Sequence, residues 1–192
     1  MVVGKVKTRL AKSIGDEAAL QVYREMVAIT EKATHNNDAD IQVYYSTKVE
    51  SNTWTRATKK IQRGNDLGEK MLNAFSDGFS EGYKNIVLIG SDLPDMSASI
   101  LNQAFNQLKN KSVVFGPAED GGYYLVGLSA LESNIFENKP WSKSHLLSTT
   151  LQELKDQRVE FSLLDTLNDI DTYEDLVSSS IYNKYSITIL SS

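Results

Sequence analysis

Apolar side chains recur at two different spacings along the chain, and the spacing alternates from segment to segment. Over residues 16–32, Leu20, Tyr23 and Val27 recur at intervals of three and four, which is the spacing of one helical face. Similar patterns predict further helices over residues 67–79, 97–109, 146–155 and 172–177. Aliphatic or β-branched runs between them predict strands over residues 41–45, 85–90, 112–116, 123–128 and 160–164. Residues 46–63 are polar and weakly patterned, so we expect mainly loop there.

The alternation of strands and helices predicts an α/β fold. Strands separated by helices of this length favour right-handed crossovers and a mainly parallel sheet that is covered on both faces. Ligands bind such sheets at the carboxyl ends of the strands, so function is expected in the loops after Ile89, after Phe115 and before Lys7. A chain of 192 residues fits one domain, which we expect over residues 1–178, with a C-terminal tail over residues 179–192.

The composition of the chain excludes several kinds of functional site and partner. The chain has no cysteine, which excludes disulfides, thiolate metal sites and cysteine nucleophiles. A net charge of −5 argues against nucleic acid as a partner of the whole surface. The longest aliphatic run, Ile86–Ile89, is too short to span a membrane, and the N-terminus lacks a stretch of signal-peptide length, so we expect a cytoplasmic protein.

The first candidate for chemistry is the basic segment at the start of the chain. Gly4 would let the backbone approach a diphosphate, while Lys7 and Arg9 would supply charge-assisted hydrogen bonds to it. A solvated basic N-terminus explains the same alternating cations, and spacing alone favours that explanation.

The second candidate is Asp92, which follows the aliphatic strand over residues 85–90. At this edge of the sheet a carboxylate can hold a hard divalent cation that bridges phosphate oxygens. The alternative is an N-cap for the next helix, but Ser97 is the better-placed cap, so we favour the metal-binding hypothesis.

The third candidate is the loop Gly116–Tyr124. Asp120 lies beside the glycine pair Gly121 and Gly122, which suits a loop that passes close to a ligand, and Tyr123 can line a sugar or base pocket. An ordinary hairpin turn between two strands explains the same residues equally well.

The fourth candidate is the pair Asp169 and Asp171. Two carboxylates at alternate positions can complete a cation site. The following residues also fit the start of a helix, with Asp171 or Thr172 as its N-cap. The sequence slightly favours this alternative.

Taken together, these segments form an ordered signature, namely Gly4-Lys5-Val6-Lys7-Thr8-Arg9-Leu10, Gly64-Asn65-Asp66-Leu67-Gly68-Glu69-Lys70-Met71, Ile89-Gly90-Ser91-Asp92-Leu93-Pro94, the loop Gly116–Tyr124 and Asp169-Ile170-Asp171-Thr172. The signature resembles the bacterial glycosyltransferase-like family called radical-SAM/selenodomain-associated transferase 1, of the nucleotide-diphospho-sugar transferase superfamily. The resemblance extends from about residue 4 to residue 177.

The resemblance implies a three-layer, Rossmann-like GT-A type fold with a mainly parallel mixed sheet. It further implies binding of a nucleoside triphosphate or nucleotide-sugar and dependence on Mg²⁺ or Mn²⁺. Asp92 and Asp171 would then hold the metal, and Asp92 and Asp120 would be the catalytic carboxylates. Substrate binding would fall to the residues Gly4, Lys7, Arg9, Asp66, Gly121, Gly122 and Tyr123.

The leading hypothesis is therefore a metal-dependent glycosyltransferase-like enzyme with a nucleoside diphosphate sugar donor and an acceptor that the sequence does not specify. One alternative is a nucleotidyltransferase that releases pyrophosphate from a nucleoside triphosphate. Another is a catalytically silent nucleotide-binding module.

The chain departs from its relatives in two places. Relatives usually begin with a hydrophobic strand before the basic segment, whereas only Met1-Val2-Val3 stands here, so the first strand of the fold is expected to be missing or truncated. Residues 85–90 should then lie beside a vacant or substituted strand position, which a partner chain or residues 186–190 would cover. The second departure is Trp141-Ser142-Lys143-Ser144, where relatives commonly have threonine soon after the tryptophan.

Overall fold

The computed structural model describes residues 3–35 and 37–185. The described residues form six α-helices, one short 3-10 helix and six strands. In chain order these are α1 (Thr8–Ile14), α2 (Asp16–Thr34), β1 (Gln42–Tyr45), β2 (Thr58–Ile61), α3 (Leu67–Ser80), β3 (Ile86–Ile89), α4 (Ala98–Gln107), β4 (Val113–Pro117), β5 (Tyr123–Leu128), η1 (Ser133–Ile135), α5 (Leu146–Asp156), β6 (Phe161–Leu163) and α6 (Tyr173–Ser178).

The strands form two separate sheets. The larger sheet has the order β3-β5-β4-β6, in which β5 is antiparallel to both of its neighbours and β6 is parallel to β4. Three of its four strands therefore run in one direction, and β5 runs in the other. Strands β1 and β2 pair in parallel as a sheet of their own. The result is a mixed sheet of the predicted class, divided into two parts.

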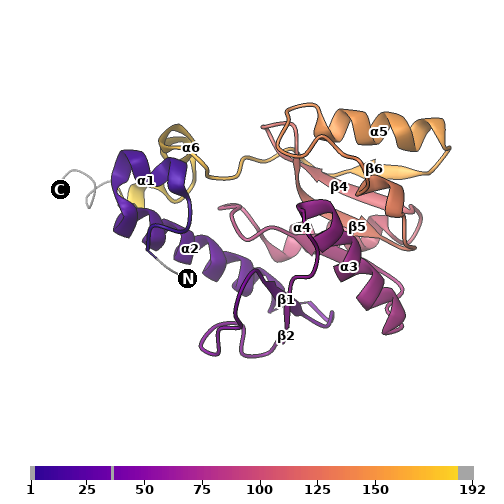
Figure 1. Cartoon of the computed structure of the whole chain (residues 1–192), viewed down its shortest axis with the longest axis horizontal. Helices are drawn as coiled ribbons and strands as arrows, with labels where there is room; N and C mark the ends of the chain where they lie inside the picture. The colour runs from indigo at the N-terminus through magenta and orange to yellow at the C-terminus, as the bar shows by residue number, and fades with distance from the viewer. Residues whose placement is uncertain (1–2, 36, 186–192) are drawn as a thin grey trace.

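Helices cover both faces of the larger sheet. Met71 and Phe75 of α3 pack with Leu154 of α5 against one face, together with side chains of β4 and β5. On the other face, α4 packs with the end of α2 against the same strands. A third cluster joins α1, the first half of α2 and α6, and these elements gather at the end of the molecule away from α5 (Figure 1). The arrangement is the expected three-layer sandwich with a small helical extension.

The helices and strands lie close to their predicted ranges, with two exceptions. Residues 8–14 form α1, whose Leu10 is completely buried, although the sequence suggested only a basic segment there. The second exception is β2, which lies within residues 46–63, where mainly loop had been expected. No helix in the described part of the chain is long and apolar enough to cross a membrane.

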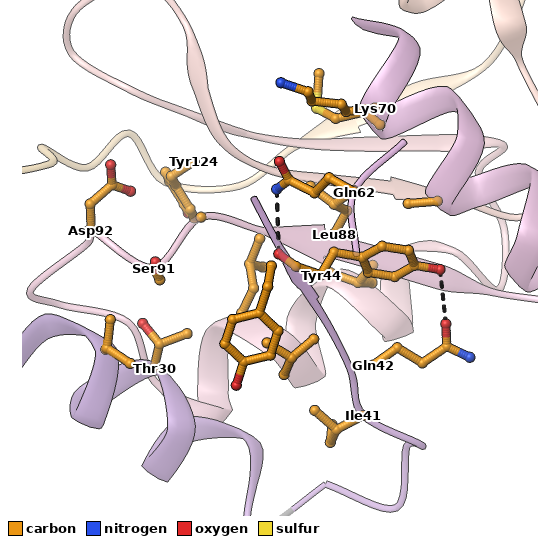
Figure 2. A pocket seen from close by; sticks show the side chains of 18 of the residues that line it. Thr30, Ile41, Gln42, Tyr44, Gln62, Lys70, Leu88, Ser91, Asp92 and Tyr124 are labelled. Carbon is orange, nitrogen blue, oxygen red and sulfur yellow. Dashed lines mark hydrogen bonds between the residues drawn. The ribbon is translucent and has the colours of Figure 1, made fainter. Parts of the chain in front are cut away.

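A gap that no described strand fills separates the two sheets, as expected for the position beside β3. In the described ranges β3 pairs only with β5 and β1 only with β2. All four aliphatic residues of β3 are only half-buried, whereas every residue of β4 is buried. A cavity of 1480 Å³ lies between β1 and β3, with Thr30, Tyr44 and Leu88 among the residues that line it (Figure 2). The proposed cover, residues 186–190, lies outside the described residues.

The gap predicts uneven hydrogen exchange across the sheet. Amides of β4 lie between β5 and β6 and should exchange slowest, whereas β1 and β3 each have one unpaired edge and should exchange faster. Exchange followed by mass spectrometry or NMR measures this difference directly. Equal protection of β3 and β4 would show that another segment occupies the gap in solution.

Candidate functional site

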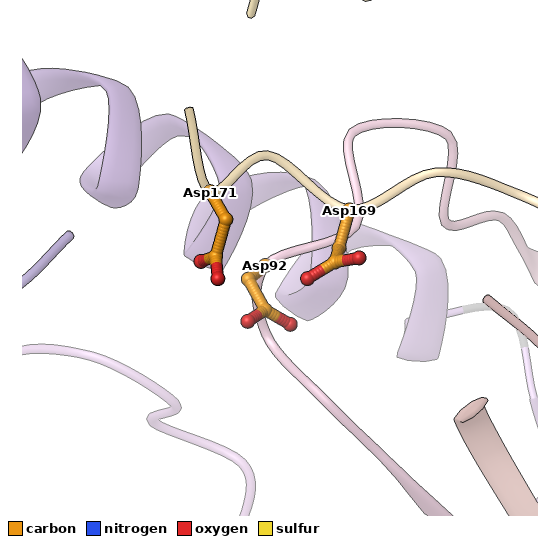
Figure 3. A group of neighbouring side chains, drawn as sticks. All are labelled: Asp92, Asp169 and Asp171. Atoms are coloured by element: carbon orange, nitrogen blue, oxygen red, sulfur yellow. The ribbon is translucent and has the colours of Figure 1, made fainter. Parts of the chain in front are cut away.

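Three carboxylates meet just beyond the end of β3. Asp92, Asp169 and Asp171 each present an oxygen, and these oxygens lie within 4.8 Å of one another. Figure 3 shows the three side chains converging from two chain segments that are distant in sequence. The cluster includes Asp92 and Asp171, the two metal ligands that the resemblance implies. It also includes Asp169, which the sequence offered with Asp171 as a pair that can complete a cation site.

Backbone contacts bring the two segments together. The amide of Ile170 donates a hydrogen bond of 3.2 Å to the carbonyl of Asp92, and the Ile170 side chain is buried. Upstream, Leu167 forms an isolated parallel bridge with Ala118, which attaches the segment to the end of β4. Because Ile170 points inward, Asp169 and Asp171 on either side of it remain free to approach Asp92.

Asp92 and Asp171 do not serve as helix caps. Thr172 caps α6 in a reciprocal capping box with Asp175, so Thr172, one of the two expected candidates, is the cap. Ser97 caps α4 by accepting a hydrogen bond from the amide of Ile100, as predicted. The capping alternatives for Asp92 and Asp171 are therefore excluded, and both side chains are available for a ligand.

Two basic side chains of the N-terminal segment reach the cluster. The Lys7 Nζ lies 2.8 Å from Oδ1 of Asp171 and 3.1 Å from Oδ2 of Asp92, and its side chain is only 7% exposed. Arg9 is 74% exposed, with its Nη1 3.7 Å from Oδ2 of Asp171. The segment is therefore not a frayed terminus. Lys7 contacts the carboxylates directly, a partner that the sequence did not suggest.

The charged groups of the cluster shift the pKa values of Asp169 and Lys7. Burial, together with the nearby charge of Asp92, raises the pKa of Asp169 to about 6. Burial opposes the charge of Lys7, but the carboxylates of Asp92 and Asp171 outweigh it and raise the pKa of this ammonium above its ordinary value. A cation between these carboxylates is thus strongly favoured, and Lys7 supplies part of that charge.

The loop after β4 is a hairpin, and it also lines the cavity. Strands β4 and β5 pair antiparallel, and the amide of Ala118 donates to the carbonyl of Gly122 across the turn. The carboxylate of Asp120 accepts a hydrogen bond of 2.8 Å from the amide of Gly122, and it lies close enough to Asp169 to raise the pKa of that carboxyl. Asp120 is therefore beside the acidic cluster but not part of it.

Gly121 is explained by packing of the protein on itself. Its φ is +88°, and a Cβ built there would lie 1.8 Å from the carbonyl oxygen of Ser144. The sequence had suggested that a ligand excludes a side chain at this position. The backbone of Ser144 already excludes one.

The two tyrosines after the glycines have different environments. The ring of Tyr123 packs on Phe115, and its hydroxyl is buried with no hydrogen-bond partner among the described residues, so burial raises its pKa. Tyr123 and Tyr124 both line the cavity. The hydroxyl of Tyr124 donates to the carbonyl of Asp165 at 3.0 Å, which fixes this ring in the core.

Two further predicted residues lie away from the cluster. Asp66 caps α3 by accepting a hydrogen bond of 2.8 Å from the amide of Glu69. Gly4 is exposed, and a Cβ built there would meet the side chain of Asp16. The structure therefore gives Asp66 a capping contact and brings neither residue to the acidic cluster.

The donor set fits Mg²⁺ or Mn²⁺. Both are hard cations that prefer carboxylate oxygens, and the described cluster offers three such groups without a soft ligand. Burial and then the charge of Asp92 raise the pKa of Asp169, so part of this shift comes from repulsion between carboxylates. A divalent cation held by Asp92, Asp169 and Asp171 would relieve that repulsion.

The fold is shared with two solved structures. A protein from Desulfovibrio desulfuricans G20, provisionally named a nucleotide-diphospho-sugar transferase, is 28% identical, with a TM-score of 0.85 over 99% of this chain and 93% of that chain. A cytidylyltransferase from Leptospira borgpetersenii serovar Hardjo-bovis (strain JB197) is 14% identical, with a TM-score of 0.56 over 85% of this chain and 76% of that one. The second likeness concerns the fold alone.

The chain thus has the fold of the nucleotide-diphospho-sugar transferases, with an acidic cluster at the carboxyl end of a strand. It belongs to the DUF2064 family, described as an uncharacterized protein conserved in bacteria, whose model matches residues 28–143. The matched range includes Asp92 and the β4–β5 hairpin, whereas Lys7, Asp169 and Asp171 lie outside it. No curated protein matches the chain.

The raised pKa of Asp169 predicts a pH-dependent loss of stability in the absence of metal. The folded protein holds this proton more tightly than the unfolded chain, whose carboxyl has the ordinary pKa of 3.8. The resulting stabilisation is complete below pH 3.8 and is lost as the pH rises through about 6. In EDTA, Asp169→Asn should therefore gain stability relative to the unchanged protein across this range.

Thermal unfolding at a series of pH values measures the difference. Asp95→Asn is the control, because Asp95 is exposed and lies outside the cluster. Parallel stability curves for Asp169→Asn and the unchanged protein would contradict the assignment.

Gly121 and Gly122 form a matched pair for a second test. Gly121→Ala combines a disfavoured φ with a backbone overlap and should destabilise the fold by about 2–4 kcal/mol. In Gly122→Ala the new Cβ would meet only the flexible Asp120 side chain, at 3.1 Å, so the cost should stay within about 1 kcal/mol. Chemical denaturation measures both values. Full stability of Gly121→Ala together with lost ligand binding would instead support the ligand explanation.

Proposed function

We propose that this protein is a metal-dependent transferase that moves a glycosyl group from a nucleoside diphosphate sugar to an acceptor. The observation that carries the proposal is the meeting of Asp92, Asp169 and Asp171 with Lys7 at the end of β3, at the edge of a large cavity. The likeness in fold to the Desulfovibrio protein supports the same class of substrate. The finer resemblance to radical-SAM/selenodomain-associated transferase 1 is part of this proposal.

The acidic cluster would hold Mg²⁺ or Mn²⁺, which, when bound, neutralises charge on the leaving diphosphate. Asp92 is its principal ligand, because it follows a strand of the sheet and its backbone is fixed by Ile170. Asp169 and Asp171 complete the oxygen set. All three side chains are partly exposed, and a substrate in the cavity can reach Asp92 and Asp169, which line it.

The remaining residues of the site would orient the two substrates. Arg9 is exposed beside Asp171 and can donate to a diphosphate. The cavity is larger than a typical ligand pocket, because it includes the gap between the sheets as well as the space beside Asp92, Asp120 and Tyr123. Asp120, at the turn of the hairpin, is the carboxylate best placed to contact the acceptor or the transferred sugar.

Asp92→Asn tests the metal site. The substitution removes a charge and weakens a ligand oxygen, so Mn²⁺ binding and metal-dependent nucleotide binding should each fall by about 100-fold or more. Calorimetric titration with Mn²⁺, and then with nucleoside diphosphates in its presence, measures both affinities. Asp95→Asn, three residues away and exposed, is the matched control. Parental affinities in Asp92→Asn would refute the assignment.

The products identify the reaction. A glycosyltransferase releases nucleoside diphosphate, whereas a nucleotidyltransferase forms a bond from the α-phosphate to a phosphorylated acceptor and releases pyrophosphate. A panel of nucleotide-sugars and nucleoside triphosphates, tested with Mg²⁺ or Mn²⁺, distinguishes the two. Pyrophosphate alone would establish the nucleotidyltransferase alternative, and binding without either product would indicate a silent module.

A further inference from the structure

Lys7 occupies the space between two of the three candidate metal ligands. Its ammonium is within hydrogen-bond distance of both Asp92 and Asp171, and the side chain is almost completely buried. Among the described residues, Lys7 and Arg9 are the only cations that form ion pairs with the cluster, and Arg9 is at the longer distance. The positive charge in the cluster is therefore that of Lys7.

A buried ammonium and a divalent cation cannot share these oxygens. Mg²⁺ requires ligand oxygens at about 2.0–2.1 Å, and each carboxylate that Lys7 engages has its charge already partly neutralised. Two cations held by the same pair of carboxylates also repel each other strongly in a partly dehydrated site. Metal binding through the oxygens that Lys7 engages, Oδ2 of Asp92 and Oδ1 of Asp171, therefore requires the ammonium to leave.

The surroundings offer the ammonium a second position. A hollow of 390 Å³ beside the cluster is lined by residues 6–9, Tyr23 and Asp171. The exposed guanidinium of Arg9 belongs to this hollow. An anionic group seated there would attract both basic side chains.

We propose that Lys7 is an internal counter-cation of the metal site, displaced when the divalent cation binds, and that phosphate of the substrate then binds the released ammonium. This inference rests on the proposed function and concerns its regulation. Metal and phosphate consequently bind with positive cooperativity. Without phosphate, Lys7 competes with the metal; with phosphate, the ammonium has another partner and the competition is relieved.

Mn²⁺ binding to Lys7→Met tests the competition. Methionine keeps the length of the side chain and removes its charge. Free Mn²⁺, followed by electron paramagnetic resonance, should show about tenfold or greater tightening in Lys7→Met without phosphate, within the usual range of coupling between sites. Inorganic phosphate, corrected for its own complex with Mn²⁺, should tighten Mn²⁺ binding to the unchanged protein and have little effect on Lys7→Met.

Lys12→Met is the matched control. Lys12 is an exposed lysine in the last turn of α1, so its loss removes the same charge without altering the cluster. It should bind Mn²⁺ like the unchanged protein. An equal increase in Mn²⁺ affinity in both variants would show that the effect arises from net charge alone, and it would overturn the inference.

A second measurement uses the unchanged protein and does not depend on the folding of a variant. Buried and paired, Lys7 should be acylated slowly by an amine-reactive acetylating reagent, and saturating Mg²⁺ should raise its rate of modification several-fold relative to Lys12. Peptide mass spectrometry measures both sites in one sample. Bound Mg²⁺ with no change in the labelling of Lys7 would overturn the inference.

The outcomes separate this inference from the proposed function. Mn²⁺ binding that depends on Asp92 but is equally tight in Lys7→Met would leave the proposed function standing and remove the displacement. An absence of Mn²⁺ binding in the unchanged protein and in Lys7→Met would remove both.

Discussion

Repulsion among Asp92, Asp169 and Asp171 is the constraint on which the rest of the site depends. Three carboxylates with oxygens within 4.8 Å of one another require positive charge nearby, or one of them must hold its proton. Lys7 supplies this charge by bridging two of the groups, while burial and the charge of Asp92 raise the pKa of Asp169 to about 6. The negative charge of the cluster is therefore partly balanced before any ligand arrives.

The scaffold holds the cluster with few contacts. A backbone hydrogen bond from the amide of Ile170 joins the late segment to Asp92, three residues beyond β3, and the capping box at Thr172 fixes where that segment turns into α6. Lys7 reaches the same point because α1 packs on α2 and α6 at the end of the molecule. The positions of the charged groups thus depend on apolar packing of elements that are far apart in sequence.

The β4–β5 hairpin shows that a structural explanation and a functional proposal can apply to the same residues. Gly121 is needed because the backbone of Ser144 leaves no room for a side chain, whatever binds nearby. The turn nevertheless carries Asp120 to the edge of the cavity, close to Asp169. The glycine is therefore evidence for the path of the backbone, and Asp120 is the residue on which a functional argument for the loop rests.

The gap beside β3 was expected from the family resemblance, because relatives have a hydrophobic strand before the basic segment. Periodicity alone determined nearly all helices and strands and the α/β class, because these depend on local spacing of apolar residues. Periodicity also selected Asp92, since a carboxylate soon after an aliphatic strand is expected at the ligand edge of the sheet. Helix α1 was missed because its burial comes mainly from Leu10 packing on distant helices. Tertiary structure alone decided that Asp169 joins Asp92, and that Lys7 contacts these carboxylates. The reason is physical: both outcomes require segments more than 75 residues apart to meet, as the separation of 85 residues between Lys7 and Asp92 illustrates, and no local pattern encodes such a contact.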